Sequence, residues 1–279
     1  MIKVIIMDID GTLANSRKEI TPKTREALIS AQQKGIMLVL ASGRPVPGLR
    51  QFGRQLQMDR YGGLYCAYNG SMVVDCRSEE VLFNQPMSAE EARSVLHHLK
   101  NFKAVPVIDK GDYMYVNDVF NNTISYNGQP FNILQYESRG NGFRLREVKD
   151  MEEFVDFPVN KILTYADPEY LQANWQAMAE PFKGRLHSVF TAPFYYEYTA
   201  LGIDKARALD TVLKSMGFKQ EEMIAYGDGQ NDASIVRYAG IGVAMANAVD
   251  ELKAVADEIT ASNEEDGIAL SLQKHGLAD

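Results

Sequence analysis

The feature that most constrains this chain is a short, mostly apolar stretch at residues 2–7 that ends in Asp8-Ile9-Asp10-Gly11-Thr12. A run of this length, closed by a turn signal, is typical of a buried strand in a parallel sheet. Because side chains alternate along a strand, we expect Asp8 and Asp10 to leave its carboxyl end on the same side. Two carboxylates so close together require a counter-charge, and oxygen ligands favour Mg²⁺ over a soft metal ion.

Length and charge limit the classes of protein to consider. The chain of 279 residues, 46% of them hydrophobic, can bury a large core and is long enough for two ordinary domains. Its formal net charge of −8 argues against a nonspecific nucleic-acid surface and against an anionic membrane partner. Cys66 and Cys76 are too few for a disulfide framework, and their spacing matches no zinc motif.

The sequence carries no recognisable targeting or membrane segment. The apolar start meets Asp8 too early for a signal peptide, and no stretch reaches the ~18 apolar residues of a membrane span. We therefore expect a cytoplasmic protein. No feature of the sequence identifies a protein partner.

The first part of the chain alternates strands and helices. Besides the opening strand, we expect strands at residues 36–41 and 64–68, with one helix from Thr21-Pro22 to about residue 34 and another over residues 47–57. This order predicts an α/β core with a doubly wound parallel sheet of the Rossmann-like kind. The strand at 36–41 ends in Ser42-Gly43-Arg44, which supplies a hydroxyl and a flexible backbone N–H. These groups lie at the carboxyl end of a strand, and Asp8 lies at the carboxyl end of the opening strand.

The pattern changes near residue 84. Ser88 begins a capping box for a helix, and alternating stretches follow at residues 105–108, 113–116 and 143–148 with no crossover helix between the first two. Alternation of helices and strands returns later in the chain. We expect a first core segment at residues 1–83, an inserted α+β cap domain with an antiparallel sheet at 84–194, and a second core segment at 195–279.

A second acidic cluster, Gly227-Asp228-Gly229-Gln230-Asn231-Asp232, follows a predicted buried strand at residues 223–226 and precedes a helix. In an open parallel sheet, loops after neighbouring strands can face each other at a switch point, so this cluster can meet the first one. Lys205, just inside a helix expected at residues 204–215, is the candidate cation. These groups would surround a small anionic ligand.

Such a set of groups suits attack by a carboxylate on a phosphate monoester, where repulsion between anions is the obstacle. A metal ion and Lys205 would reduce that repulsion and leave Asp8 to attack phosphorus and form an aspartyl-phosphate. Asp10 would protonate the leaving alcohol and later deprotonate the hydrolytic water. Asp228 would complete the metal site, with Asp232 either as a direct ligand or behind it.

Taken in order, these stretches resemble the four motifs of the haloacid dehalogenase-like phosphatase superfamily: Asp8-Ile9-Asp10-Gly11-Thr12, Ser42-Gly43-Arg44, Lys205, and Gly227-Asp228-Gly229-Gln230-Asn231-Asp232. The chain is most similar to the Cof-type sugar-phosphate phosphatases, whose α+β cap is inserted after the third core strand. The resemblance implies that Asp8 is the nucleophile and Asp10 the acid and base. It implies Mg²⁺ bound by Asp8, the backbone carbonyl of Asp10 and Asp228, with Asp232 at the same site. The positions expected to bind substrate phosphate are Ile9, Ser42, Gly43, Lys205 and Asn231.

Several alternatives remain open at this point. The expected partner is a small phosphorylated metabolite, with sugar phosphates the favoured class, and a phosphomutase with the same core chemistry is the nearest rival. A regulatory phospho-acceptor module uses similar groups but needs only ~120 residues on a single sheet. The inserted segment argues against such a module, because a lid is useful for enclosing a small substrate. Arg44 can reach toward substrate or merely pair with a surface carboxylate, and Asn69 can form a turn or touch ligand.

Overall fold

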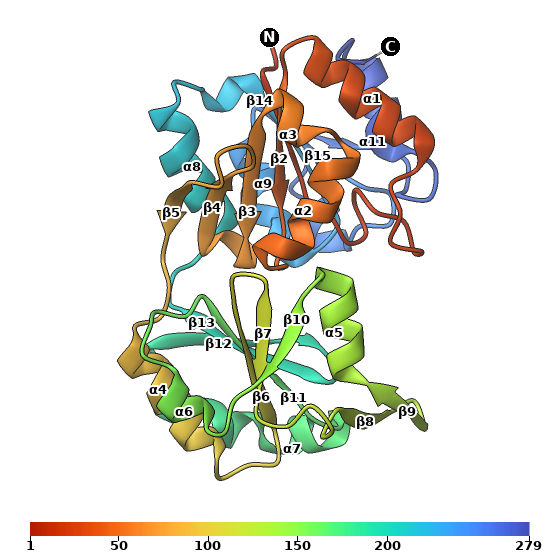
Figure 1. Cartoon of the computed structure of the whole chain (residues 1–279). Helices are drawn as coiled ribbons and strands as arrows, with labels where there is room; N and C mark the ends of the chain where they lie inside the picture. Colours follow the sequence, from red (N-terminus) through yellow and green to blue (C-terminus); the bar gives the residue numbers. More distant parts are fainter. Residues whose placement is uncertain (279) are drawn as a thin grey trace. The chain divides into compact units, whose positions relative to one another are not determined.

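The computed structural model describes residues 1–278, which form two compact units that we treat separately (Figure 1). The core unit consists of Met1–Asn84 together with the chain from Asp204 onward, and the insert unit is Gln85–Ile203. The end of the insertion therefore differs from the expected boundary after residue 194. Strand β13 (Tyr195–Ala200) pairs with β11 (Lys161–Tyr165) and β12 (Leu186–Ala192), so it belongs to the insert unit.

The core unit is built on one mainly parallel sheet of eight strands. Its strand order is β16-β15-β14-β1-β2-β3-β4-β5, and the first six strands in this order run parallel to one another. The strands are β1 (Val4–Met7), β2 (Met37–Ala41), β3 (Gly63–Ala67), β4 (Met72–Asp75), β5 (Val81–Asn84), β14 (Met223–Gly227), β15 (Ile241–Ala244) and β16 (Glu258–Ile259). This arrangement confirms the α/β class predicted from the sequence.

Helices cover both faces of this sheet because each strand presents apolar side chains on both sides. One face packs against α1 (Pro22–Gln33), α2 (Val46–Gln55) and α11 (Gly267–Lys274), and the other against α8 (Lys205–Ser215), α9 (Ala233–Tyr238) and α10 (Asp250–Lys253). In β1, for example, Ile5 and Met7 face the first layer while Val4 and Ile6 face the second. The remaining helices of the core unit are α3 (Met58–Tyr61), η1 (Tyr68–Gly70), η3 (Gln220–Glu222) and η4 (Gln230–Asp232).

The insert unit has its own six-stranded sheet in the order β10-β7-β6-β11-β13-β12. Helices α4 (Ala89–Leu99), α6 (Met151–Phe154) and α7 (Pro168–Ala179) pack on one face, while α5 (Ile133–Asn141) packs on the other. The further elements are β6 (Val105–Lys110), β7 (Tyr113–Val116), β10 (Arg144–Glu147), η2 (Glu180–Phe182), and a separate hairpin of β8 (Thr123–Tyr126) and β9 (Gln129–Asn132).

Two details of the sheets differ from the expected topology. The core sheet continues beyond β3 with β4 and β5, which pair antiparallel and were not predicted. The sheet of the insert unit is mixed. β10 pairs parallel to β7, while all the other pairs of neighbouring strands in this sheet are antiparallel. Short, mostly exposed strands such as β5 give weak sequence patterns, which is why alternation did not reveal them.

None of the helices formed by residues 1–278 has both the length and the apolar character needed to cross a membrane. Cys66 is buried, Cys76 is half-buried, and both are free thiols, as their small number predicted.

Candidate active site at the carboxyl ends of three parallel strands

The central strands of the core sheet deliver the predicted polar residues to one edge. β1 lies between β14 and β2, and Met7 is in register with both Tyr226 and Leu40. The residues that follow the three strands are Asp8 after β1, Ser42 after β2 and Asp228 after β14. Parallel strands end at the same edge of a sheet, so segments about 220 residues apart in sequence meet there.

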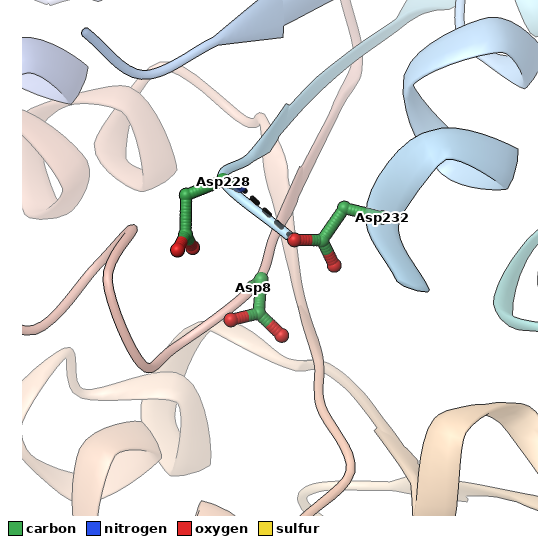
Figure 2. Close-up of side chains that lie close together, drawn as sticks. All are labelled: Asp8, Asp228 and Asp232. Atoms are coloured by element: carbon green, nitrogen blue, oxygen red, sulfur yellow. Dashed lines mark hydrogen bonds between the residues drawn. The ribbon is translucent and has the colours of Figure 1, made fainter. Parts of the chain in front are cut away.

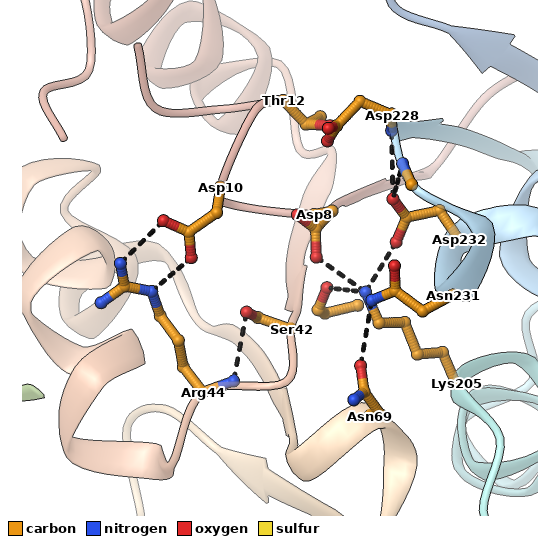
Figure 3. A network of polar contacts seen from close by, with 12 residues as sticks. Asp8, Asp10, Thr12, Ser42, Arg44, Asn69, Lys205, Asp228, Asn231 and Asp232 are labelled. Carbon is orange, nitrogen blue, oxygen red and sulfur yellow. Dashed lines mark hydrogen bonds and ion pairs between the residues drawn. The ribbon is translucent and has the colours of Figure 1, made fainter. Parts of the chain in front are cut away.

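Lys205 joins the nucleophile candidate to the second acidic cluster. Its ammonium group donates hydrogen bonds to Asp8 Oδ1 at 2.7 Å, to Asp232 Oδ1 at 2.7 Å and to the carbonyl oxygen of Ala41 at 2.8 Å (Figure 3). Lys205 is 1% exposed, and Asp204 caps the start of its helix by accepting from Arg207 N. Burial acts to lower the pKa of Lys205, but the two carboxylates outweigh it and raise the pKa, so the side chain is a fixed cation.

The loop after β14 is held by Asp232 and Thr12. Asp232 Oδ2 accepts hydrogen bonds from the backbone N–H groups of Asp228 at 3.0 Å and Gly229 at 2.9 Å. Thr12 Oγ1 donates to Asp228 Oδ1 at 2.6 Å. Both oxygens of Asp232 are therefore engaged by protein donors, whereas the Asp228 carboxylate receives one hydroxyl.

The carboxylates of Asp8, Asp228 and Asp232 form a cluster that suits a hard divalent cation. One oxygen from each of the three lies within 4.8 Å of the others (Figure 2). Burial and the Asp232 carboxylate raise the pKa of Asp8 despite the opposing effect of Lys205, and burial raises the pKa of Asp228 to about 6. Crowded carboxylates with raised pKa values need added positive charge, and an all-oxygen donor set is the one that Mg²⁺ prefers. The residues present therefore fit the metal site predicted from the sequence.

Asp10 points away from this cluster in the structure. Its carboxylate accepts hydrogen bonds from Arg44 Nε at 2.6 Å, from Arg44 Nη2 at 2.8 Å and from Lys18 Nζ at 2.6 Å (Figure 3 shows the arginine pair). Burial alone would raise the pKa of Asp10, but Arg44 and Lys18 outweigh it and lower the pKa to about 2. Arg44 thus pairs with a carboxylate, but with that of Asp10 in the site and not with one on the surface as the second alternative had it.

The expected phosphate-binding positions lie around the same edge. Ser42 is 3% exposed, and its Oγ accepts from Arg44 N at 3.2 Å. Asn231 Nδ2 donates to Asn69 Oδ1 at 3.1 Å, and a Cβ atom placed on Gly43 would lie 3.0 Å from Asn69 Nδ2. The side chain of Ile9 is fully buried in the hydrophobic core, so this residue can reach a ligand only through its backbone.

Two contacts of the site were not foreseen from the sequence. Lys18 was not singled out, because it lies in a charged stretch that looks like an ordinary solvated loop. Asn247 Nδ2 donates to the carbonyl oxygen of Gly11 at 2.8 Å and so ties the turn after β1 to the loop after β15.

Comparisons with known proteins agree with this geometry. A family model described as haloacid dehalogenase-like hydrolase matches residues 5–272. A haloacid dehalogenase-like hydrolase from Bacteroides thetaiotaomicron has a solved structure that superposes with a TM-score of 0.91 at 33% identity, covering 99% of this chain and 100% of that one.

Two further relatives carry named activities. A 5-amino-6-(5-phospho-D-ribitylamino)uracil phosphatase from Bacillus subtilis is 31% identical over 287 residues, covering 98% of this chain and 95% of that protein. The solved structure of a sugar phosphatase of haloacid dehalogenase subclass IIB superposes with a TM-score of 0.78 at 25% identity, covering 99% of both chains. Both are phosphatases of small phosphorylated compounds.

Proposed function

Because the chain belongs to the haloacid dehalogenase-like hydrolases and is a phosphatase of that family, we propose that it hydrolyses sugar phosphates through an aspartyl-phosphate on Asp8, with Mg²⁺ as cofactor. The observation that carries the proposal is the environment of Asp8. Asp8 is 6% exposed and follows the central strand β1, and its carboxylate is held 2.7 Å from the Lys205 ammonium beside Asp228 and Asp232.

In the first half of the reaction, a carboxylate oxygen of Asp8 forms a bond to phosphorus as the ester oxygen leaves. Asp10, turned away from Arg44 and Lys18 and protonated once it has lost those two cations, gives its proton to that oxygen, so the leaving group departs as a neutral alcohol. Lys205 offsets the negative charge that gathers as two anions meet. The products of this step are the free alcohol and a phosphoryl group covalently bound to Asp8.

In the second half, water attacks the phosphorus of the aspartyl-phosphate. Asp10, now unprotonated, takes a proton from that water, and the bond from phosphorus to the Asp8 oxygen breaks. Inorganic phosphate leaves and both carboxyl groups return to their starting states. Ser42, the Gly43 N–H and Asn231 are the groups we assign to orient the phosphoryl oxygens in both steps.

The carboxylates of Asp8 and Asp228 and, by the family resemblance, the backbone carbonyl of Asp10 would hold Mg²⁺. When bound there, the ion supplies positive charge that reduces repulsion between Asp8 and the substrate phosphate. Because both oxygens of Asp232 already accept hydrogen bonds, we assign Asp232 the role of orienting Lys205 and the Asp228 loop toward that site.

Sugar phosphates are the substrate class that we propose. The similarity to a solved sugar phosphatase supports it, while the ribitylaminouracil phosphatase indicates that related chains differ in leaving group.

The test is phosphate release from a panel of hexose phosphates and from p-nitrophenyl phosphate, with and without Mg²⁺. We expect metal-dependent release, and we expect Asp8→Asn to reduce it by about a thousandfold or more, because the amide oxygen is a poor nucleophile. Asp59→Asn, which changes an exposed carboxylate on α3, is the matched control and should stay active. Isomerisation of a hexose phosphate without release of phosphate would contradict the proposal and favour a mutase.

A further inference from the structure

Asp10 is bound in this structure as an anion would be bound by a receptor. Three donors on two cations, Arg44 and Lys18, contact its two oxygens at 2.6 to 2.8 Å. The arginine donates through two of its nitrogens, which is the geometry that guanidinium groups use for carboxylates and phosphates. The pair of cations therefore forms a preformed cradle for an anionic oxygen group.

Arg44 is fixed independently of Asp10. Its backbone N–H donates to Ser42 Oγ at 3.2 Å, and its carbonyl oxygen accepts from Tyr68 N at 3.0 Å. Its guanidinium carbon lies 5.5 Å from the centroid of the Phe52 ring, which is itself buried. With its side chain only 16% exposed, Arg44 keeps its place when the carboxylate turns away.

Lys18 is placed by a tight loop. Asn15 N donates to Glu19 O and Lys18 N donates to Asn15 O, and Lys18 itself has a φ of 62°. A left-handed conformation is uncommon for lysine, and the ammonium group of Lys18 contacts Asp10 Oδ1 at 2.6 Å. Its side chain is 52% exposed, so the cradle is open to solvent on this side.

The reaction requires Asp10 to leave this cradle. As the proposed acid and base, its carboxyl group must reach the leaving oxygen next to Asp8, whereas in Figure 3 it is turned toward Arg44. Its departure removes three charge-assisted hydrogen bonds from two cations beside the site. An incoming anion that made equivalent bonds would stabilise the orientation in which Asp10 can react.

We propose that Arg44 and Lys18 form an anion subsite, which Asp10 fills in this structure and which an anionic oxygen group of the substrate fills in its place. The inference rests on the proposed function, because the acid and base role in that function requires the carboxyl group of Asp10 to lie next to Asp8. The anionic group has two possible sources, namely the transferring phosphate itself or a second phosphate or carboxylate elsewhere on the substrate.

Two phosphonates that cannot be hydrolysed distinguish these sources. Phosphonoacetate carries a second anionic group, and acetonylphosphonate replaces that group with a neutral ketone of similar size. Their affinities for the full chain in Mg²⁺ are measured by calorimetry, which needs no turnover. The variants are Lys18→Met and Arg44→Lys, and the control is Arg17→Met, which removes a charge from the same loop but pairs with Glu19.

We expect Lys18→Met to weaken binding about two- to fivefold and Arg44→Lys about tenfold, because the lysine lacks the planar fork, while Arg17→Met changes nothing. Equal weakening for both phosphonates supports the subsite with the transferring phosphate as its occupant, and weakening for phosphonoacetate alone supports a second anionic group. Unchanged affinities in Lys18→Met and Arg44→Lys would overturn the proposal, as would failure of the unmodified chain to bind either phosphonate.

The exposed Lys18 variant keeps the test valid if Arg44→Lys fails to fold. Failure of the subsite is also distinguishable from failure of the proposed function. Near-native phosphate release by Asp8→Asn would refute the nucleophile, whatever the phosphonate affinities are.

Discussion

The carboxylate of Asp8 is almost fully buried, and a buried carboxylate is stable as an anion only where partners replace water. Lys205 is that partner here, and it is equally buried between Asp8 and Asp232. One lysine with two carboxylates leaves this group of residues short of positive charge. The shortage is the physical reason to expect that a cation and the Asp8 nucleophile belong to one site.

A single glycine controls the approach of the first acidic cluster to the second. Gly11 has a φ of 89°, and a Cβ atom there would lie 2.2 Å from Asp228 Oδ2. We predict that Gly11→Ala displaces the Asp228 carboxylate and reduces phosphate release by at least about a hundredfold. Backbone strain should also lower the free energy of unfolding by about 1–2 kcal/mol.

Gly35→Ala is the matched control for this prediction. Gly35 has a nearly equal φ of 86°, but no atom lies within 4 Å of an added Cβ. It should show a similar loss of stability, measured by urea denaturation, with normal phosphatase kinetics. Equal loss of activity in both variants would mean that strain rather than displacement of Asp228 is responsible.

At the scale of elements, the site depends on strand ends that stay in register. β16 is a two-residue strand at the edge of the core sheet, and Glu258 within it accepts from Lys274 Nζ of α11 at 2.7 Å. The hydrogen bond from Lys274 lowers the pKa of Glu258. This contact fastens the edge of the sheet to the helix layer that covers one of its faces.

The ion pair makes stability depend on pH in a defined direction. Because the pKa of Glu258 is lower in the folded state, its contribution is present above its ordinary value of 4.5 and is lost as pH falls through the lower folded value. We predict that Glu258→Gln lowers the free energy of unfolding by at most about 1 kcal/mol at neutral pH. The difference from the unmodified chain should vanish in acid.

Denaturant unfolding at a series of pH values measures this dependence, with the exposed Glu251→Gln as the control. A difference that persisted unchanged in acid would show that Glu258 stabilises the strand by packing rather than by charge.

At the scale of the whole molecule, two units have separate hydrophobic cores. The sequence predicted an inserted domain, but it placed the end of that domain at the wrong residue. The acidic clusters were readable because each follows a short apolar strand, and parallel strands bring such ends together. The boundary after residue 194 was wrong because β13 is fully buried in the sheet of the insert unit. Only strand pairing decides to which sheet such a strand belongs.

The orientation of the Asp10 side chain also could not be predicted from the sequence. Strand alternation placed Asp8 and Asp10 on one side, but Asp10 lies past the end of β1, in the turn, where alternation no longer holds. Its partners Arg44 and Lys18 come from two different loops, and neither has a pattern that specifies the contact. Side-chain pairing between loops depends on tertiary packing, which sequence periodicity does not encode.

The most direct test of the account is to trap the covalent intermediate. In Asp10→Asn, attack by Asp8 on p-nitrophenyl phosphate needs no acid because nitrophenolate leaves readily, whereas hydrolysis lacks its base and slows. We predict that acid-quenched Asp10→Asn carries one phosphoryl group on the peptide containing Asp8, found by mass spectrometry, and that adding Asp8→Asn abolishes it. A phosphoryl group on another residue, or release of nitrophenolate with no phosphorylated peptide, would contradict the account.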